Sequence, residues 1–264
     1  MARHESFKQD FMADSAGQSS TNSQVPDLSV VVLCYHAGEP IRQLVQQLID
    51  TLVGGGIRIF ELILVANDWS ESHDQTARIV SSMAAVDSRL VAVTERKAGM
   101  MGWDVKQGLR RACGNTIAIF EGDGQVVPAE LMRAYALLHR GSYDVVKTYR
   151  TARHDGLMRR LLSLMYNGLF HLLFPGVHAR DINSKPKLFT RAAYEQLRLT
   201  ADDWFIDAEM MIQAQAIGLD IGELPITFHP LEGRRSFVTP GTILEFIGNL
   251  VRYRFKSFRR RRNR

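Results

Sequence analysis

Three oxygen-bearing side chains alternate with glycines directly after an apolar stretch of the chain: Glu121, Asp123 and Gln125. The preceding residues 116–120 are apolar and partly β-branched, as expected of a strand that is buried on both faces. Open α/β sheets bind ligands at the carboxyl ends of their strands, and hard oxygen ligands suit Mg²⁺ or Mn²⁺. The spacing therefore predicts a divalent metal site that holds a diphosphate, with an ordinary acidic turn as the alternative.

The first half of the chain repeats a unit of strand, loop and helix that would position this site. Apolar runs predict strands over 28–35, 60–66 and 90–93, and Pro40 and Pro128 are placed to open helices. Repetition at this interval predicts an α/β fold with a largely parallel sheet and helices on both faces. Acids and glycines should then collect in loops at one edge of the sheet.

Length and composition are those of a globular protein with one large domain or one domain with appendages. The 264 residues are 45% hydrophobic and 23% charged. Cys34 and Cys113 are too few for a disulfide framework, which indicates a reducing cytoplasm, with Cys34 in the core. Residues 1–27 are polar, lack the apolar core of a signal peptide, and are expected to form a disordered leader.

The net charge of +5 is unevenly distributed along the chain. Residues 252–264 carry eight Arg or Lys and no acid, which leaves 25 basic against 28 acidic residues elsewhere. This pattern argues against a broad nucleic-acid-binding face and favours a local anionic partner. Residues 241–264 are predicted to form an amphipathic helix and basic tail on an anionic membrane surface. A solvated tail and a nucleic-acid contact are the alternatives.

The order of these pieces resembles the family 2 glycosyltransferases, which have the nucleotide-diphospho-sugar (GT-A) fold. The segments that carry the resemblance are V-V-V-L-C-Y at 30–35, N-D-W-S at 67–70, K-A-G at 97–99 and E-G-D-G-Q at 121–125. The family's corresponding loops read D-D-G-S and D-x-D-G-Q, so Asn67, Trp69 and Glu121 depart from its pattern. The resemblance spans about residues 27–238 and implies a GT-A domain over 28–240.

The resemblance implies a nucleotide-diphospho-sugar donor. Asp68 would accept a hydrogen bond from the nucleotide base, and Tyr35 would lie near the base or ribose. The donor-binding residues expected on this basis are Tyr35, Glu39, Asn67, Asp68 and Gly99. The expected ligands of Mg²⁺ or Mn²⁺ are Glu121, Asp123 and Gln125. From the residues alone, Asp68 also fits a turn or helix cap, and Tyr35 fits simple packing.

Residues 157–175 form an apolar stretch that is too short and interrupted to span a bilayer. Ser163, Asn167 and His171 recur every fourth residue and make one narrow polar stripe on a helix. The pattern fits a helix in the membrane interface and, equally, a buried core helix. With D-I-N-S-K-P-K-L-F at 181–189, the stretch resembles the polyprenyl-phosphate branch, which includes dolichyl-phosphate mannose synthases and bacterial undecaprenyl-phosphate glycosyltransferases.

This second resemblance implies a polyprenyl phosphate acceptor. Arginine suits phosphate because it forms bidentate, charge-assisted hydrogen bonds. The expected acceptor-binding residues are Arg150, Arg159, Ser163, Arg234, Arg235 and Ser236. The segment 231–237 departs from the R-x-x-G-x-S-K of that branch, since Leu231 replaces its Arg, Arg234 its Gly and Phe237 its Lys.

W-F-I-D-A-E at 204–209 resembles the segment that opens the family's last core helix, and Asp207 is expected to be catalytic together with Asp123. With a hydroxyl acceptor Asp207 would act as general base. A phosphate acceptor is already an anion and needs no base, so Asp207 would then orient an arginine. An ordinary acid in the first turn of a helix is the third possibility.

Together these features predict a metal-dependent, inverting sugar transferase at the cytoplasmic face of the membrane, with a polyprenyl phosphate as acceptor. One alternative is a related enzyme that glycosylates a hydroxyl group of a glycan, glycolipid or natural product. Another is a non-catalytic membrane-bound relative that kept the fold.

Overall fold

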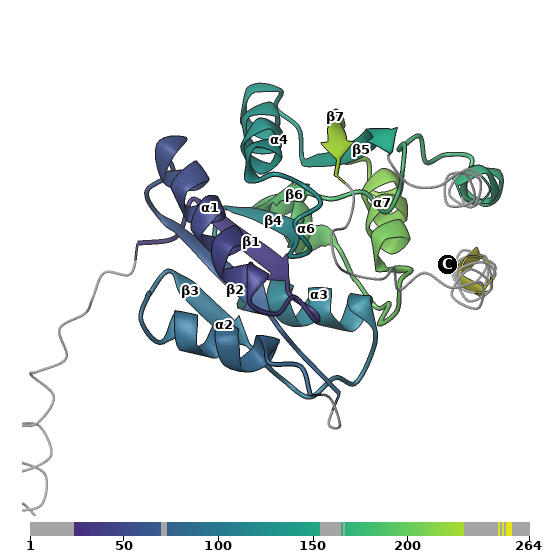
Figure 1. Ribbon diagram of the computed structural model, residues 1–264. Coiled ribbons are helices and arrows are strands. Elements are labelled where there is room, and N and C mark those ends of the chain that lie inside the picture. Colours follow the sequence, from purple (N-terminus) through teal and green to yellow (C-terminus); the bar gives the residue numbers. More distant parts are fainter. Residues whose placement is uncertain are drawn as a thin grey trace, which may run out of the picture.

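A seven-stranded sheet forms the centre of the structure, a computed structural model (Figure 1). The structure describes residues 24–69, 73–153, 165, 167–229, 248, 250 and 252–254. The strands are β1 (Leu28–Leu33), β2 (Phe60–Val65), β3 (Leu90–Val93), β4 (Thr116–Glu121), β5 (Val145–Arg153), β6 (Lys187–Thr190) and β7 (Ile221–Phe228). Their order across the sheet is β3-β2-β1-β4-β6-β5-β7, and β6 runs antiparallel to both of its neighbours.

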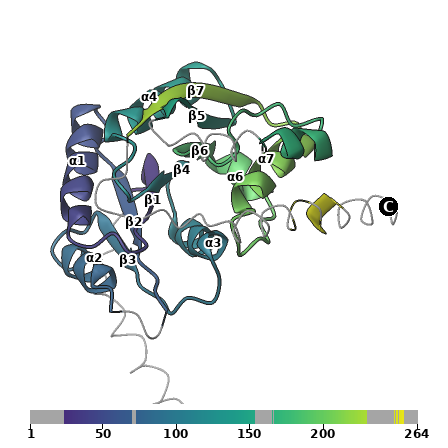
Figure 2. The same cartoon turned by 45° about the vertical axis from the view of Figure 1, so that its right-hand side comes forward.

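Helices cover both faces of this sheet, as the βαβ spacing predicts (Figure 2). They are α1 (Pro40–Gly54), α2 (Thr76–Ala84), α3 (Met101–Arg111), α4 (Pro128–Arg140), α6 (Arg191–Gln196) and α7 (Ile206–Ala216). One core lies between the sheet and α1, α2 and α4, and a second lies between the sheet and α3, α6 and α7. Within β1, Val30 belongs to the first core and Val31 to the second, so the strand is buried on both faces.

The predicted fold class is confirmed, with small changes at the strand ends. Pro40 and Pro128 are the first residues of α1 and α4, where the missing N–H of proline costs no hydrogen bond. The strand predicted over 28–35 ends at Leu33, which leaves Tyr35 in the loop that follows. Cys34 is fully buried, as expected of a core residue.

The apolar stretch after β5 has one buried and one exposed side where the structure describes it. Residues 167–173 are helical; Phe170 is fully buried, whereas Leu172 is 77% exposed. Leu250, near the C-terminus, is also fully buried, and the ring of Tyr253 lies 4.6 Å from that of Phe205. Part of the predicted C-terminal helix therefore packs against the domain. Among the described residues, no helix has the length and apolarity needed to cross a membrane.

Candidate active site

Three neighbouring parallel strands, β2, β1 and β4, have their carboxyl ends side by side. Leu33 of β1 pairs with Val65 of β2 on one side and with Glu121 of β4 on the other. From β1 the chain proceeds to β2 in one direction and later returns to β4 in the other, which makes these strand ends a topological switch point. Ligands of open α/β sheets bind in the crevice at such a point.

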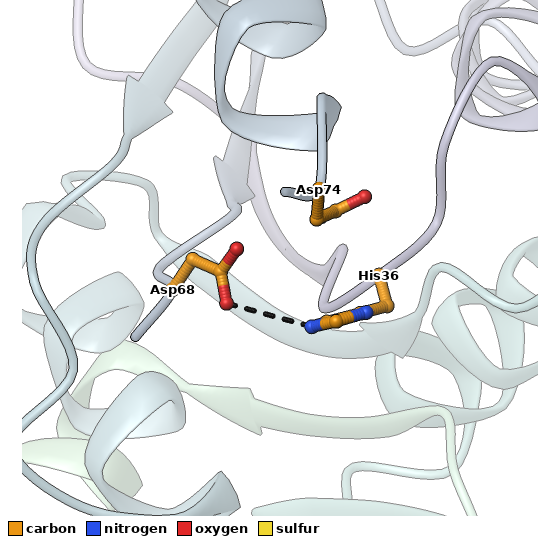
Figure 3. Close-up of side chains that lie close together, drawn as sticks. All are labelled: His36, Asp68 and Asp74. Carbon is orange, nitrogen blue, oxygen red and sulfur yellow. Dashed lines mark ion pairs between the residues drawn. The ribbon is translucent and has the colours of Figure 1, made fainter. Parts of the chain in front are cut away.

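The loops after β1 and β2 bring together the predicted nucleotide-binding side chains. Nε2 of His36 lies 3.4 Å from Oδ1 of Asp68, and the ligand atoms of His36, Asp68 and Asp74 all lie within 4.8 Å of one another (Figure 3). The ring of Tyr35 lies 4.2 Å from that of His36. Burial raises the pKa of Tyr35, and the charge of Asp68 adds to the rise. The structure therefore brings Tyr35 and Asp68 together and adds His36, which the sequence left unassigned.

Asn67 directly precedes Asp68, and its side chain is buried and hydrogen-bonded. It is 1% exposed, donates to Oδ1 of Asp104 at 3.0 Å and accepts from the backbone N–H of Glu95 at 2.6 Å. Asp104 also pairs with Lys97, whose ammonium lies 4.4 Å from the centre of the Tyr35 ring. The hydrogen bond from Asn67 to Asp104 thus links the end of β2 to α3. Asp104 in turn pairs with Lys97, whose ammonium contacts the ring of Tyr35.

Two other predicted donor-binding residues, Glu39 and Gly99, make contacts within the protein. Glu39 is exposed at the start of α1 and pairs with Arg42 at 2.8 Å. Gly99 lies against the loop before α7, and a Cβ there would come within 2.7 Å of Cβ of Trp103 and 3.1 Å of Cβ of Asp202. Gly99 is therefore required for close packing of two loops.

The acidic turn after β4 gives each of its three predicted metal ligands a different partner. Oε1 of Glu121 accepts a hydrogen bond from Lys185 at 2.9 Å. Asp123 accepts from the backbone N–H of Gln125 at 3.0 Å, and Nε2 of Gln125 donates to the carbonyl of His229 at 2.9 Å. Each of the three side chains is thus fixed in place from a different direction.

Asp123 is the residue of this turn whose surroundings best fit a divalent ion. Its side chain is partly exposed, and a Cβ on the next residue, Gly124, would meet no atom within 4 Å. A partly exposed carboxylate fits Mg²⁺ or Mn²⁺, which commonly takes its remaining ligands from substrate phosphates and water. The roles of Glu121, Asp123 and Gln125 as metal ligands stay predictions.

Asp207 lies in the first turn of α7 and is held between two buried lysines. Its Oδ2 accepts from Lys185 at 2.8 Å and its Oδ1 from Lys187 at 2.5 Å. Asp207, Lys185 and Lys187 are exposed by 1%, 4% and 0%. These lysines were missed from the sequence, although charged residues beside an apolar strand segment are a signal that a buried partner of opposite charge is needed.

The ion pairs determine the protonation of this cluster. Burial opposes the charged form of Asp207, but Lys185 and Lys187 together outweigh it and hold its pKa below the usual value. Burial also opposes the charged form of Lys185, and Asp207 and Glu121 outweigh it and raise its pKa. Burial lowers the pKa of Lys187 to about 7. With both oxygens engaged by lysines and its pKa lowered, Asp207 has the character of an anchor for these two lysines.

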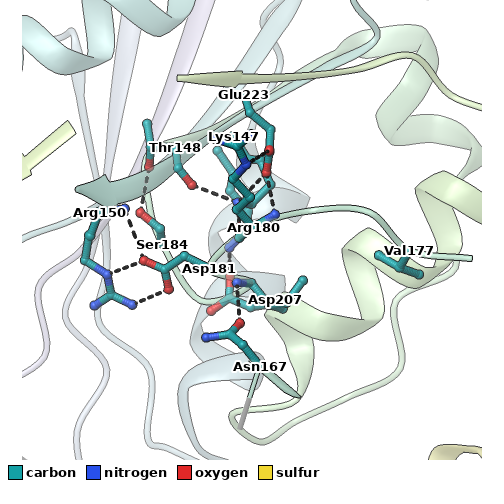
Figure 4. Close-up of polar contacts among 12 residues, drawn as sticks. Lys147, Thr148, Arg150, Asn167, Val177, Arg180, Asp181, Ser184, Asp207 and Glu223 are labelled. Atoms are coloured by element: carbon teal, nitrogen blue, oxygen red, sulfur yellow. Dashed lines mark hydrogen bonds and ion pairs between the residues drawn. The ribbon is translucent and has the colours of Figure 1, made fainter. Parts of the chain in front are cut away.

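Arg150, the predicted acceptor-binding residue that the structure describes, is oriented by an acid (Figure 4). Its guanidinium donates to both oxygens of Asp181, at 2.6 and 2.7 Å, and lies 5.0 Å from the centre of the Phe228 ring. Nearby, Oγ1 of Thr148 lies 2.9 Å from Oγ of Ser184. The other predicted acceptor-binding residues lie outside the described part of the chain: Arg159, Ser163, Arg234, Arg235 and Ser236.

A family model shows where the chain belongs. The model described as glycosyl transferase family 2 matches residues 29–198, and the chain is a member of that family. It is similar to glycosyltransferase AglD of Haloferax volcanii, with 29% identity over 77% of this chain and 33% of the relative. It is also similar to dodecaprenyl-phosphate galacturonate synthase of Rhizobium johnstonii, with 26% identity over 78% of this chain and 60% of the relative. The chain thus spans between a third and three fifths of the length of these two relatives.

Solved structures confirm the GT-A fold. Glucosyl-3-phosphoglycerate synthase of Mycobacterium tuberculosis is similar with a TM-score of 0.63 and 18% identity, covering 86% of this chain and 78% of that protein. The same enzyme in complex with Mn²⁺, uridine diphosphate and glucosyl-3-phosphoglycerate has a TM-score of 0.61 and 16% identity, covering 86% and 76%. At this identity the likeness establishes the fold.

Substitution of Asp207 tests its role as the anchor of two buried lysines. Asp207→Asn should lower the free energy of unfolding by about 3–5 kcal/mol, because it leaves buried ammonium groups without their carboxylate. Asp202→Asn is the matched control, since Asp202 is 56% exposed in its pair with Lys106 and should lose at most about 1 kcal/mol. Urea denaturation followed by circular dichroism measures both. Equal losses in the two variants would contradict the anchor role.

Proposed function

We propose that the protein transfers a sugar from a nucleotide-diphospho-sugar to a polyprenyl phosphate. The observation that carries the choice of acceptor is the geometry of Asp207, whose two oxygens are both engaged by lysines. A hydroxyl acceptor needs a general base, whereas a phosphate is already an anion. The names of two relatives support the same class: dodecaprenyl-phosphate galacturonate synthase, and the undecaprenyl-phosphate 4-deoxy-4-formamido-L-arabinose transferase of Yersinia pestis.

In this proposal the loops after β1 and β2 bind the nucleoside. The carboxylate of Asp68 accepts a ring N–H of the base, and the ring of Tyr35 lies alongside, supported by the cation of Lys97. Asp123 holds a divalent ion at the donor diphosphate. The ion, Mg²⁺ or Mn²⁺, supplies positive charge that stabilises the leaving nucleoside diphosphate. The domain thereby orients the sugar with its anomeric carbon toward the acceptor side.

The acceptor phosphate would lie on the side of Arg150. Asp181 fixes the guanidinium of Arg150 in one orientation, and a charged, planar donor held in this way is suited to a phosphate oxygen. Arg159, Ser163, Arg234, Arg235 and Ser236 complete the proposed acceptor site. One oxygen of the phosphate attacks the anomeric carbon opposite the leaving diphosphate, which inverts the configuration of the sugar.

We also propose that the enzyme works at the cytoplasmic face of the membrane as a peripheral protein. The side chains of Met165 and Leu172 are exposed and present apolar surface in the stretch after β5. Because Leu250 is buried against the domain, the basic residues beyond Arg254 are the better candidates for contact with anionic lipid.

Two linked measurements test the transfer reaction. Calorimetry should show that UDP or GDP binds in the presence of Mn²⁺, and Asp123→Ala should weaken that binding at least about tenfold, as expected when an ion loses its carboxylate ligand. Sugar conjugates of the nucleotide that binds are then incubated with undecaprenyl phosphate or with undecaprenol, and the extracted lipid is analysed by mass spectrometry. Glycosylation of the phosphate alone is expected. Equal glycosylation of undecaprenol would contradict the proposed acceptor, and failure of both nucleotides to bind would contradict the transferase.

Truncation tests the membrane contact. Removal of residues 255–264 eliminates six basic side chains and leaves Leu250 and Tyr253 packed against the domain. At about 1 kcal/mol for each basic residue near the surface, binding to phosphatidylglycerol vesicles should fall by two orders of magnitude or more at low salt. Binding to neutral phosphatidylcholine vesicles serves as the control and should not change. Unchanged binding to the anionic vesicles would show that the tail is not the anchor.

A further inference from the structure

Lys185 connects the acidic turn after β4 with the first turn of α7. Its ammonium donates to Oε1 of Glu121 at 2.9 Å and to Oδ2 of Asp207 at 2.8 Å, and it also lies 3.7 Å from Sδ of Met101. The side chain is 2% exposed, so it is held in one place by its two carboxylate partners. Lys187 donates to the other oxygen of Asp207, and no hydrogen bond joins it to the described residues of the turn.

Glu121, one of the two carboxylate partners of Lys185, also departs from the family's pattern. Glu121 stands where family 2 glycosyltransferases have aspartate, and its side chain is one methylene longer. The carboxylate of a glutamate at the end of β4 extends further from the backbone and meets Lys185 at hydrogen-bonding distance. Glu121 and Lys185 therefore act as a matched pair, in which the longer acid and the buried cation satisfy one another.

The ammonium of Lys185 is fixed beside the turn after β4, and its positive charge lowers the affinity of that turn for cations. The charge of Lys185, shared between Glu121 and Asp207, offsets part of the charge of Glu121 and repels a cation that approaches Oε1 of that carboxylate. A divalent ion at the turn is then held chiefly through Asp123. An ion held by a single carboxylate needs oxygen ligands from elsewhere, and a diphosphate supplies them together with a compensating negative charge.

We propose that Lys185 is a positioning residue that reserves Glu121 and makes tight binding of the divalent ion depend on the donor diphosphate. This inference rests on the proposed function, since it assumes that the ion and the diphosphate bind at the turn after β4. In this proposal Lys185 determines the order of binding. The divalent ion enters together with the diphosphate, and the domain has low affinity for the ion when no donor is bound.

The test compares two lysines that share one carboxylate. Lys185→Met and Lys187→Met each remove one buried ammonium from Asp207 and replace it with an apolar chain of similar length, but only Lys185 contacts Glu121. Calorimetric titration with Mn²⁺ alone, without nucleotide, should show affinity about tenfold or more higher in Lys185→Met than in the wild type. Lys187→Met should match the wild type. Equal affinities in Lys185→Met and the wild type would overturn the proposal.

A third variant keeps the test decisive where removal of Lys185 prevents folding. Glu121→Gln retains Lys185 and removes the carboxylate that it reserves; thermal unfolding establishes that each variant is folded. In the presence of UDP or GDP, Glu121→Gln should bind Mn²⁺ within about threefold of the wild type, whereas loss of binding as large as in Asp123→Ala would overturn the proposal. Failure of the wild type to bind either nucleotide would instead contradict the proposed function.

Discussion

The carboxylate of Asp207, buried between Lys185 and Lys187, is the interaction on which the arrangement of the site depends. It joins α7 to β6 through Lys187 and to the end of β4 through Lys185 and Glu121. Three charged groups this deeply buried are tolerated only when each is paired, so the position of any one of them fixes the other two. The turn that carries Asp123 is thereby held against a helix that lies more than eighty residues further along the chain.

The pairing of Asp207 with two lysines also bears on whether the acceptor is a hydroxyl group or a phosphate. A carboxylate whose pKa is lowered by two ammonium groups is a poor proton acceptor, and both oxygens of Asp207 accept hydrogen bonds from buried lysines. Two cations near the site, Lys185 and Arg150, are both oriented by acids, and the proposed acceptor phosphate lies on the side of Arg150. An anionic acceptor and an anionic leaving group suit such surroundings, and this is the physical basis for preferring a phosphate acceptor.

Local patterns were sufficient to predict the fold and the edge of the sheet where the site lies. Apolar strands ending in acids and glycines identified β1, β2 and β4, and the βαβ spacing placed Tyr35, Asp68 and Asp123 at one edge. The partners of buried charges could not be predicted in this way. Asp207 is 20 residues from Lys187, and the loop that packs on Gly99 is about a hundred residues away, so those contacts exist only once the sheet has formed. The burial of Asn67 is likewise a tertiary property, which its position in the loop after β2 does not reveal.

The central claim is that the ion and the diphosphate bind at the end of β4 and the nucleoside at the ends of β1 and β2. A crystal structure of the protein with Mn²⁺ and the nucleoside diphosphate that it binds, with anomalous diffraction recorded at the manganese edge, tests this claim directly. The account predicts one strong anomalous peak in contact with the carboxylate of Asp123 and with the diphosphate oxygens. A peak held instead by His36, Asp68 and Asp74, the three residues whose ligand atoms lie within 4.8 Å of one another, would contradict it.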